Sequence, residues 1–255
     1  MDRVLERDGV QLHYEVHGEG RAGLPLLLTH GYGASTAMWR PNLEALAAAR
    51  PVIAWDIRGH GRTAAPPSPE HYSQDASVAD MAAILDACGI TRAAIGGLSL
   101  GGYLSLAFHL AWPGRVAALL LFDTGPGYKN DEGRDRWNRY AISRAKRLEE
   151  EGSGALGDSP ETRLARHDPV GLALAARGIL TQHDPAVINS LPEVAVPTLV
   201  LVGERDEGFL AASDYMASRI PGAHKVVIPD AGHAANIDQP EAFNDAVTRF
   251  LADLA

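Results

Sequence analysis

Hydrophobic residues along this chain alternate between short apolar runs and segments with helical spacing. Three runs rich in branched aliphatic residues open the sequence and predict strands at Gln11–Val16, Leu24–Thr29 and Val52–Trp55. Further along, helical spacing predicts helices at Ser77–Cys88, Leu100–Ala111, Leu210–Arg219 and Pro240–Leu254. Between these helices, apolar runs predict strands at Ala93–Ile95, Val116–Phe122, Thr198–Val202 and Lys225–Ile228.

Several of these apolar runs contain no polar residue at alternate positions, as at Ala118–Leu121 and Leu199–Val202. Such runs are typical of strands that helices cover on both faces. The sequence therefore predicts an α/β protein with a largely parallel sheet.

The alternation of strands and helices is interrupted between Thr124 and Leu191. The first part of this segment carries an apolar stripe on one helical face, made of Trp137, Tyr140, Ala141 and Leu148. Packing onto the body of the protein is the favoured interpretation of this stripe, and lining a ligand pocket is the alternative. We expect residues 125–190 to form a helical insertion, and residues 1–124 and 191–255 to form the core that carries it.

Two His-Asp-Pro triplets, at residues 167–169 and 183–185, lie in the second part of this segment. In each triplet an N-cap Asp precedes a Pro at the first helical position, so helix starts explain them better than metal binding does. No other metal or cofactor motif is found, because the chain lacks His-Glu-x-x-His, a phosphate-binding loop and a Cys cluster. We therefore expect no metal and no cofactor.

Residues 97–101 read Gly-Leu-Ser-Leu-Gly and join a predicted strand to a predicted helix. In this context Gly-x-Ser-x-Gly is typical of a nucleophilic serine on a strained turn, with glycines that leave room for neighbouring backbone. The pattern predicts Ser99 as the nucleophile.

A serine hydroxyl needs a base within hydrogen-bond reach and a third group that orients this base. The loops after the last two predicted strands supply Asp206 and His233, in the chain order typical of this architecture. Asp123, directly after the strand Val116–Phe122, is the alternative acid, and Glu204 and Glu207 lie near Asp206. We favour Asp206 as the acid.

Four motifs together resemble the α/β-hydrolase fold family, specifically its small single-chain members with a cap inserted after the sixth strand. The motifs are His30-Gly31-Tyr32-Gly33, Asp56-Ile-Arg-Gly-His-Gly-Arg-Thr63, the turn at Ser99 and Gly232-His233, with Thr63 where the family usually has Ser. The resemblance implies a mostly parallel eight-stranded sheet flanked by helices, with a small helical cap. It also implies an oxyanion hole made by the backbone N–H groups of Tyr32 and Leu100. Trp137 and Tyr140 are candidate substrate contacts. His30 is a third, although bracing of the loops is the favoured interpretation of this residue.

Composition narrows the possible partners. The formal net charge of −9 disfavours nucleic acid, which needs a concentrated basic surface. The longest apolar run, Val116–Phe122, is too short to cross a bilayer, and the first residues contain no signal-peptide stretch, so we expect a cytoplasmic protein. The single cysteine, Cys88, has no partner for an internal disulfide and falls on a predicted core face.

The leading hypothesis is a serine hydrolase that cleaves a small, apolar carboxylic ester or lactone through an acyl-enzyme. Three other activities use the same triad and remain open: carbon–carbon bond hydrolysis, elimination of a small acid by a lyase, and perhydrolase chemistry. A ligand receptor built on the hydrolase scaffold is the alternative from a different functional class.

Overall fold

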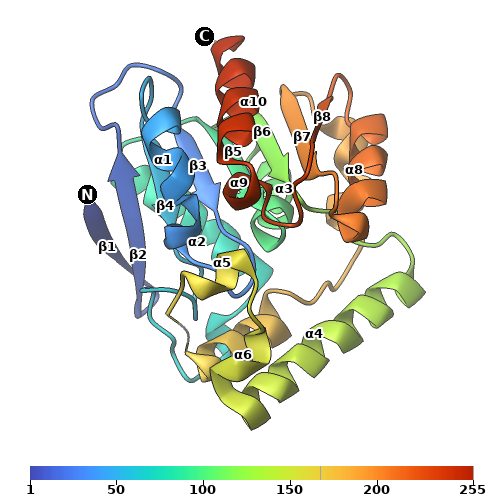
Figure 1. Cartoon of the computed structure of the whole chain (residues 1–255). Helices are drawn as coiled ribbons and strands as arrows, with labels where there is room; N and C mark the ends of the chain where they lie inside the picture. The colour runs from blue at the N-terminus through green and yellow to red at the C-terminus, as the bar shows by residue number, and fades with distance from the viewer. Residues whose placement is uncertain (167, 255) are drawn as a thin grey trace.

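One mixed sheet organises the part of the chain that the computed structural model describes, residues 1–166 and 168–254. Within those residues the sheet has eight strands in the order β1-β2-β4-β3-β5-β6-β7-β8 (Figure 1). Their bounds are Asp2–Arg7, Val10–His17, Leu26–Thr29, Val52–Trp55, Ala93–Leu98, Val116–Phe122, Thr198–Gly203 and His224–Ile228 for β1 to β8. β2 is antiparallel to both β1 and β4, and the other neighbouring pairs are parallel. The predicted fold class is confirmed.

Helices cover both faces of the sheet (Figure 1). On one face α1 and α10 contribute to one core cluster, and on the other face α2, α3 and α8 contribute to a second. Five of the helices are α1 (Arg40–Leu46), α2 (Gln74–Ala87), α3 (Leu100–Ala111), α8 (Glu207–Arg219) and α10 (Pro240–Ala252). Short helices complete this part: η1 (Thr36–Trp39), η2 (Pro69–His71), η3 (Pro113–Arg115), η5 (Leu191–Glu193) and α9 (Ala235–Asp238).

The hydrophobic pattern predicted the first and last residue of several elements. β4, β6 and α3 have the predicted limits. Every residue of β6 except Ala117 is buried, because helices cover this strand on both faces. Continuous apolar runs are therefore a reliable signal at the centre of this sheet.

Strand β1 is the strand that the hydrophobic pattern did not predict. It lies at the edge of the sheet and pairs only with β2. Its residues alternate between exposed and half-buried, and charged side chains occur on both faces of its sequence Asp-Arg-Val-Leu-Glu-Arg. A strand that buries so little apolar surface leaves almost no hydrophobic periodicity to detect.

Between β6 and β7 the chain leaves the sheet and forms a group of helices at the carboxyl ends of the strands (Figure 1). We call these the cap helices: α4 (Asp131–Glu151), η4 (Gly152–Leu156), α5 (Pro160–Arg163), α6 (Pro169–Gly178) and α7 (Ala186–Asn189). Ala145 and Leu148 of α4 pack with Leu172 and Ala176 of α6 in a small core of their own. The cap helices therefore have a small apolar core of their own, and Ala141 of α4 and Ala175 of α6 also join one of the clusters on the sheet.

The Asp-Pro pairs of the two His-Asp-Pro triplets, Asp168-Pro169 and Asp184-Pro185, both lie at helix starts. The Asp168 carboxylate accepts hydrogen bonds from the N–H groups of Val170 (2.9 Å) and Gly171 (3.1 Å), which confirms the predicted start of α6. His167 of the same triplet lies outside the described residues. The second helix, α7, begins one residue later than predicted, and Asp184 accepts from the N–H of Ala186 (2.8 Å).

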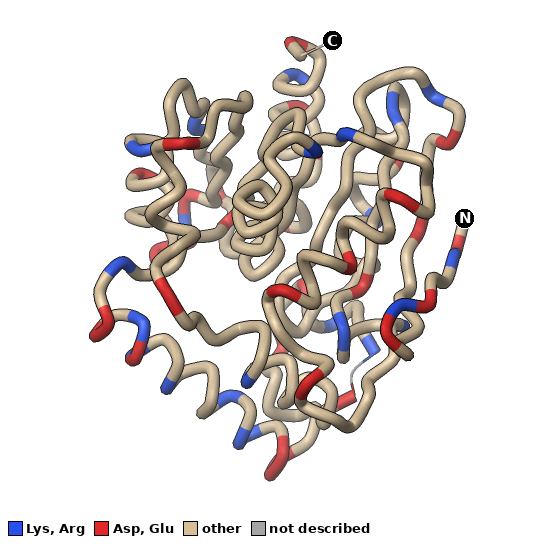
Figure 2. Tube along the Cα trace, turned by 180° about the vertical axis from the view of Figure 1, so that it is seen from behind, with Lys and Arg blue, Asp and Glu red and all other residues tan. Residues whose placement is uncertain are grey.

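Charged residues of both signs are spread along α4, which runs across one side of the molecule (Figure 2). Its buried positions are few and include Ala141, Ala145 and Leu148. Among the described residues, no helix is both long enough and apolar enough to cross a membrane.

A close approach of α3 to β3 generates a test of the fold. A Cβ atom at Gly101 would lie 2.1 Å from the Thr29 carbonyl oxygen, a contact that only movement of the helix relieves. We expect Gly101→Ala to lower the free energy of unfolding by about 3 kcal/mol or more, the upper end for overpacking. Urea unfolding measures this effect. Gly114→Ala is the matched control, because nothing lies within 4 Å of a Cβ there. Equal stability of the two variants would contradict this account of the packing.

Candidate active site

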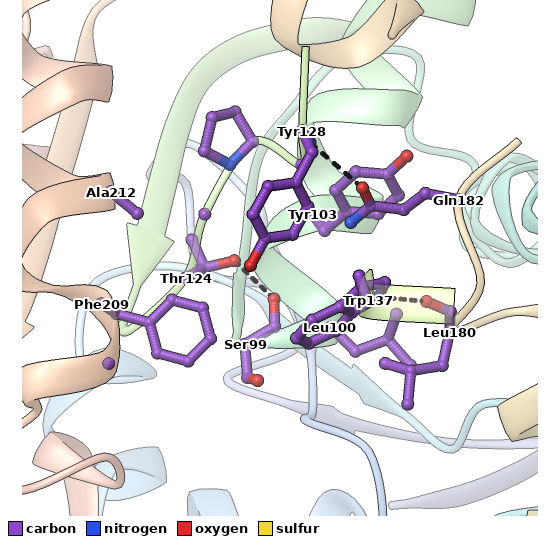
Figure 3. A pocket seen from close by; sticks show the side chains of 14 residues that line it. Ser99, Leu100, Tyr103, Thr124, Tyr128, Trp137, Leu180, Gln182, Phe209 and Ala212 are labelled. Atoms are coloured by element: carbon purple, nitrogen blue, oxygen red, sulfur yellow. Dashed lines mark hydrogen bonds between the residues drawn. The ribbon is translucent and has the colours of Figure 1, made fainter. Parts of the chain in front are cut away.

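Ser99 occupies the junction between β5 and α3 with a strained backbone. Its φ is 55° and its ψ is −115°, a conformation that side-chain-bearing residues rarely adopt. Two hydrogen bonds hold this turn: Ser99 N–H donates to the Phe122 carbonyl (2.9 Å), and the Thr124 hydroxyl donates to the Ser99 carbonyl (2.6 Å; Figure 3). The turn therefore presents the Ser99 side chain at the carboxyl edge of the sheet.

The loop after β3 lies directly against Ser99. A Cβ atom at Gly31 would be 3.4 Å from the Ser99 Cβ, so the next residue, Tyr32, begins beside the serine. Among the described residues, neither the Tyr32 N–H nor the Leu100 N–H donates to another protein group. An oxyanion hole needs two such backbone N–H groups, next to a serine and not engaged in other hydrogen bonds.

His233 and Asp206 meet across the loops that follow β8 and β7. The two loops are joined by hydrogen bonds from Glu204 N–H to Ile228 O (2.9 Å) and from Arg205 N–H to Ala231 O (2.8 Å). His233 Nδ1 lies 2.8 Å from Asp206 Oδ2, and Asp206 is 8% exposed. Because Asp206 accepts at Nδ1, the neutral imidazole of His233 carries its proton on Nδ1, and Nε2 is available as a base.

Opposing effects act on the pKa of His233. Burial lowers it, but the hydrogen bond that His233 Nδ1–H donates to Asp206 and the charge of that carboxylate raise it, and the net pKa lies above the ordinary value of 6.5. The ring of Phe209 stacks on His233, with centroids 5.0 Å apart and 23° between the planes. Phe209 therefore limits the movement of the imidazole on one ring face.

Two cavities meet at Ser99. The first, of about 120 Å³, is mostly apolar and reaches between α3, α4 and α8 (Figure 3). The second, of about 390 Å³, is lined by Ser99 and His233 together with residues of the cap helices. Ser99, Trp137, Leu180 and Phe209 line both cavities.

The Ser99 hydroxyl makes no hydrogen bond with another described residue. It shares the second cavity with His233, so both side chains face the same space. Catalytic hydrogen bonds are often long before substrate binds and shorten in the complex. The arrangement can therefore support proton transfer between these two side chains once a substrate occupies the cavity.

The apolar stripe of α4 divides between packing and cavity lining. Ala141 and Leu148 are buried, as the favoured interpretation expected. Trp137 lines both cavities and its Nε1–H donates to Leu180 O (2.7 Å), while Tyr140 lines the second cavity. Trp137 and Tyr140 thus line the cavity that Ser99 and His233 also line, as candidate substrate contacts should.

His30 lies elsewhere. It is fully buried, accepts a hydrogen bond from Ile57 N–H at Nε2 (3.0 Å) and contacts the Gly31 carbonyl through Nδ1 (2.7 Å). It lines neither of the two cavities at Ser99. His30 therefore connects the loop after β3 to the loop after β4. This position does not support a contact between His30 and a substrate.

The alternative acid, Asp123, sits behind the site in a different environment. Its φ is 45°, it is fully buried, and its Oδ1 accepts a hydrogen bond from Gly203 N–H (2.7 Å). Its Oδ2 has no hydrogen-bond partner among the described residues. Burial raises the pKa of Asp123 to about 8, so this carboxyl is protonated at neutral pH and braces the end of β7.

Sequence reasoning missed several residues that line the site, namely Thr124, Phe209, Gln182 and Arg144. Thr124 and Phe209 lie within three residues of Asp123 and Asp206, so their closeness to the candidate acids was an available signal. Gln182 and Arg144 gave none, because their orientation depends on how the cap helices pack.

One group of residues has the spacing of a cation site. Ligand atoms of Asp2, His13 and Glu15 lie within 4.8 Å of one another, the one such cluster detected in the described part of the chain. The guanidinium of Arg62 already bonds to both carboxylates, at 2.9 Å to Asp2. These residues do not line either cavity at Ser99.

Comparison with known proteins agrees with this architecture. The sequence model of the alpha/beta hydrolase family matches residues 26–246, so the chain belongs to that family. The chain is 32% identical, over 98% of both sequences, to a Bacillus subtilis protein provisionally named 2-succinyl-6-hydroxy-2,4-cyclohexadiene-1-carboxylate synthase. It is also 32% identical to a Caulobacter segnis protein provisionally named carbamate hydrolase RutD, over 93% of this chain and 95% of the relative.

Among solved structures, a thermophilic esterase from Thermogutta terrifontis with malate bound is similar along the whole chain. The TM-score is 0.85 at 28% identity, and the match covers 100% of this chain and 99% of the esterase. Family membership and this likeness together support a hydrolase.

The buried carboxyl of Asp123 generates a pH prediction. Its folded pKa of about 8 lies above the ordinary 3.8, so its contribution to stability is complete below 3.8 and is lost as the pH rises through 8. Asp123→Asn keeps an oxygen for Gly203 N–H and removes the titration. Between these pH values we therefore expect the free energy of unfolding of the variant to rise relative to that of the wild type, by up to about 1.4 kcal/mol per pH unit. Urea unfolding over a pH series measures the difference, and parallel curves would contradict the prediction.

Proposed function

We propose that this protein is a serine hydrolase that cleaves a carboxylic ester, lactones included, through an acyl-enzyme. The observation that carries the proposal is the strained Ser99 turn, which shares a cavity with the Asp206-bonded His233. The backbone N–H groups of Tyr32 and Leu100, which donate to no other described group, support the same chemistry.

In this mechanism the Ser99 hydroxyl oxygen attacks the ester carbonyl carbon while His233 Nε2 takes the hydroxyl proton. The tetrahedral oxyanion is stabilised by the N–H groups of Tyr32 and Leu100, and Asp206 stabilises the imidazolium. His233 then gives the proton to the departing alkoxide oxygen as the carbonyl re-forms. Water, deprotonated by His233, releases the acid from Ser99 in the second half of the reaction.

A second candidate is elimination of a small acid on the same triad. It is favoured by the 32% identity, over 98% of both sequences, with the Bacillus subtilis relative whose provisional name is that of a synthase. In an elimination His233 would act as a base on a substrate proton, and no acyl-enzyme would form. Fold likeness does not distinguish these two reactions.

Replacement of the nucleophile tests the leading proposal. We expect Ser99→Ala to lower turnover of 4-nitrophenyl esters by about 10⁴-fold or more, because the residual rate comes only from binding and the oxyanion hole. The variant should also lose covalent labelling by a serine-directed phosphonate, detected by mass spectrometry. Ser218→Ala, an exposed serine on α8, is the control that keeps both properties.

Two outcomes would argue against ester hydrolysis. Wild-type labelling in Ser99→Ala would remove Ser99 as the nucleophile. A labelled Ser99 with no turnover across short, long, aromatic and cyclic esters would favour the elimination reaction.

The pH dependence of the esterase identifies the acid that orients His233. Because His233 acts as a base only when neutral, kcat/KM should fall as the pH drops through a pKa above 6.5. Asp206→Asn should move this pKa downward, since the carboxylate is what raises it, and should lower kcat by about 10³- to 10⁴-fold. Asp123→Asn should leave kcat within about 10-fold of the wild type. A larger loss from Asp123→Asn than from Asp206→Asn would assign the orienting role to Asp123.

A further inference from the structure

The second cavity contains a cation beside the proposed nucleophile. Arg144 of α4 lines this cavity together with Ser99 and His233. Other cationic residues of α4 are exposed, namely Arg136, Arg139 and Lys146. Arg144 is only partly exposed, so its guanidinium is directed into the site.

The guanidinium of Arg144 lacks a carboxylate partner among the described residues. On the same helix, Arg134 pairs with Asp131 and Arg147 pairs with Glu151. Arg144 is in no ion pair, its Nε is buried with no hydrogen-bond partner, and its Nη1 makes only a long bond of 3.3 Å to the Tyr140 hydroxyl. A partly buried arginine with open donors is costly to leave unpaired.

Aromatic rings hold this guanidinium in place. Its central carbon lies 5.4 Å from the centroid of the Tyr32 ring and 5.8 Å from that of the Tyr140 ring. The Tyr32 hydroxyl in turn donates to Leu172 O of α6 (2.8 Å), which fixes the ring between the loop after β3 and the cap helices. Stacking on aromatic faces leaves the N–H groups at the edge of the guanidinium free to donate.

We propose that the substrate carries a carboxylate and that Arg144 binds it while Ser99 attacks the ester carbonyl; this inference rests on the hydrolase function proposed above. The planar fork of a guanidinium matches the two oxygens of a carboxylate. The mostly apolar first cavity takes the remaining part of the substrate on the other side of Ser99. Arg144 thereby selects anionic esters over neutral ones.

A second charge in this cavity opposes the anion and sharpens the test. Glu161 of α5 lines the same space, and its Oε1 accepts a hydrogen bond from the Ser159 hydroxyl (2.6 Å). It forms no ion pair with Arg144. Glu161→Gln removes a like charge from the path of the carboxylate, so it should improve kcat/KM for anionic esters only.

The experiment compares charged and neutral substrates of equal shape. Each 4-nitrophenyl hydrogen dicarboxylate from adipate to suberate is paired with the ester in which a methyl ketone replaces the free carboxylate. We expect Arg144→Met to lower kcat/KM for the best anionic ester by about 10- to 100-fold, the range for loss of a charge-assisted hydrogen bond. The neutral partner should stay within about 2-fold, which shows that the variant is folded and its triad intact.

Arg139→Met is the matched control. It removes the same charge from the exposed side of the same helix, so it reproduces any effect of net charge on substrate encounter. Calorimetry with free pimelate gives a readout that does not need turnover: the dicarboxylate should bind wild-type protein and Arg139→Met, and not Arg144→Met.

The outcomes separate the two proposals. Ser99-dependent turnover of neutral esters, with no charge preference and with equal effects of Arg144→Met and Arg139→Met, overturns the role of Arg144 and leaves the hydrolase standing. Absence of turnover and of Ser99 labelling overturns the hydrolase. In that case pimelate binding that is lost only in Arg144→Met still supports the carboxylate site, and equal binding by both variants overturns it.

Discussion

The close approach of α3 to β3 is the constraint on which the site depends. Gly101 brings the backbone of the helix so near to Thr29 that no Cβ atom fits between them. This contact fixes the first turn of α3, and Ser99 must therefore adopt its strained backbone to join the helix to β5. Hydrogen bonds to Phe122 at the end of β6, and from Thr124 two residues later, compensate for the strain. The nucleophile candidate is thus positioned by a close contact between the backbones of α3 and β3.

The parallel sheet then brings the remaining groups to the same edge. β6, β7 and β8 are neighbours, so Asp123, Asp206 and His233, which follow them, lie close together. Burial makes the two carboxyl groups different. Asp206 bonds to the imidazole, whereas Asp123 is enclosed, has a raised pKa and holds the N–H of Gly203. One acid is suited to carry charge beside His233, and the other is suited to support the loop.

Tyr32 links this rigid edge to the cap helices. Its N–H lies beside Ser99, its hydroxyl bonds to Leu172 of α6, and its ring packs against the Arg144 guanidinium. Burial raises the pKa of the Tyr32 hydroxyl, which therefore stays neutral as a hydrogen-bond donor. A change in the position of the cap helices would therefore also move the loop that carries the Tyr32 N–H.

By itself the sequence determined the fold and most of the residues at the centre of the site. The fully apolar run of β6 and the Gly-x-Ser-x-Gly turn are local signals, because a strand buried on both faces and a serine on a tight turn each demand particular residues within a few positions. The edge strand β1 left no such signal, since it buries little apolar surface. Only the tertiary structure decided that Asp206 rather than Asp123 bonds to His233, and that His30 lines neither of the two cavities at Ser99. It also decided that Arg144 has no carboxylate partner among the described residues. These properties depend on distances between segments far apart in the chain, and hydrophobic periodicity does not encode such distances.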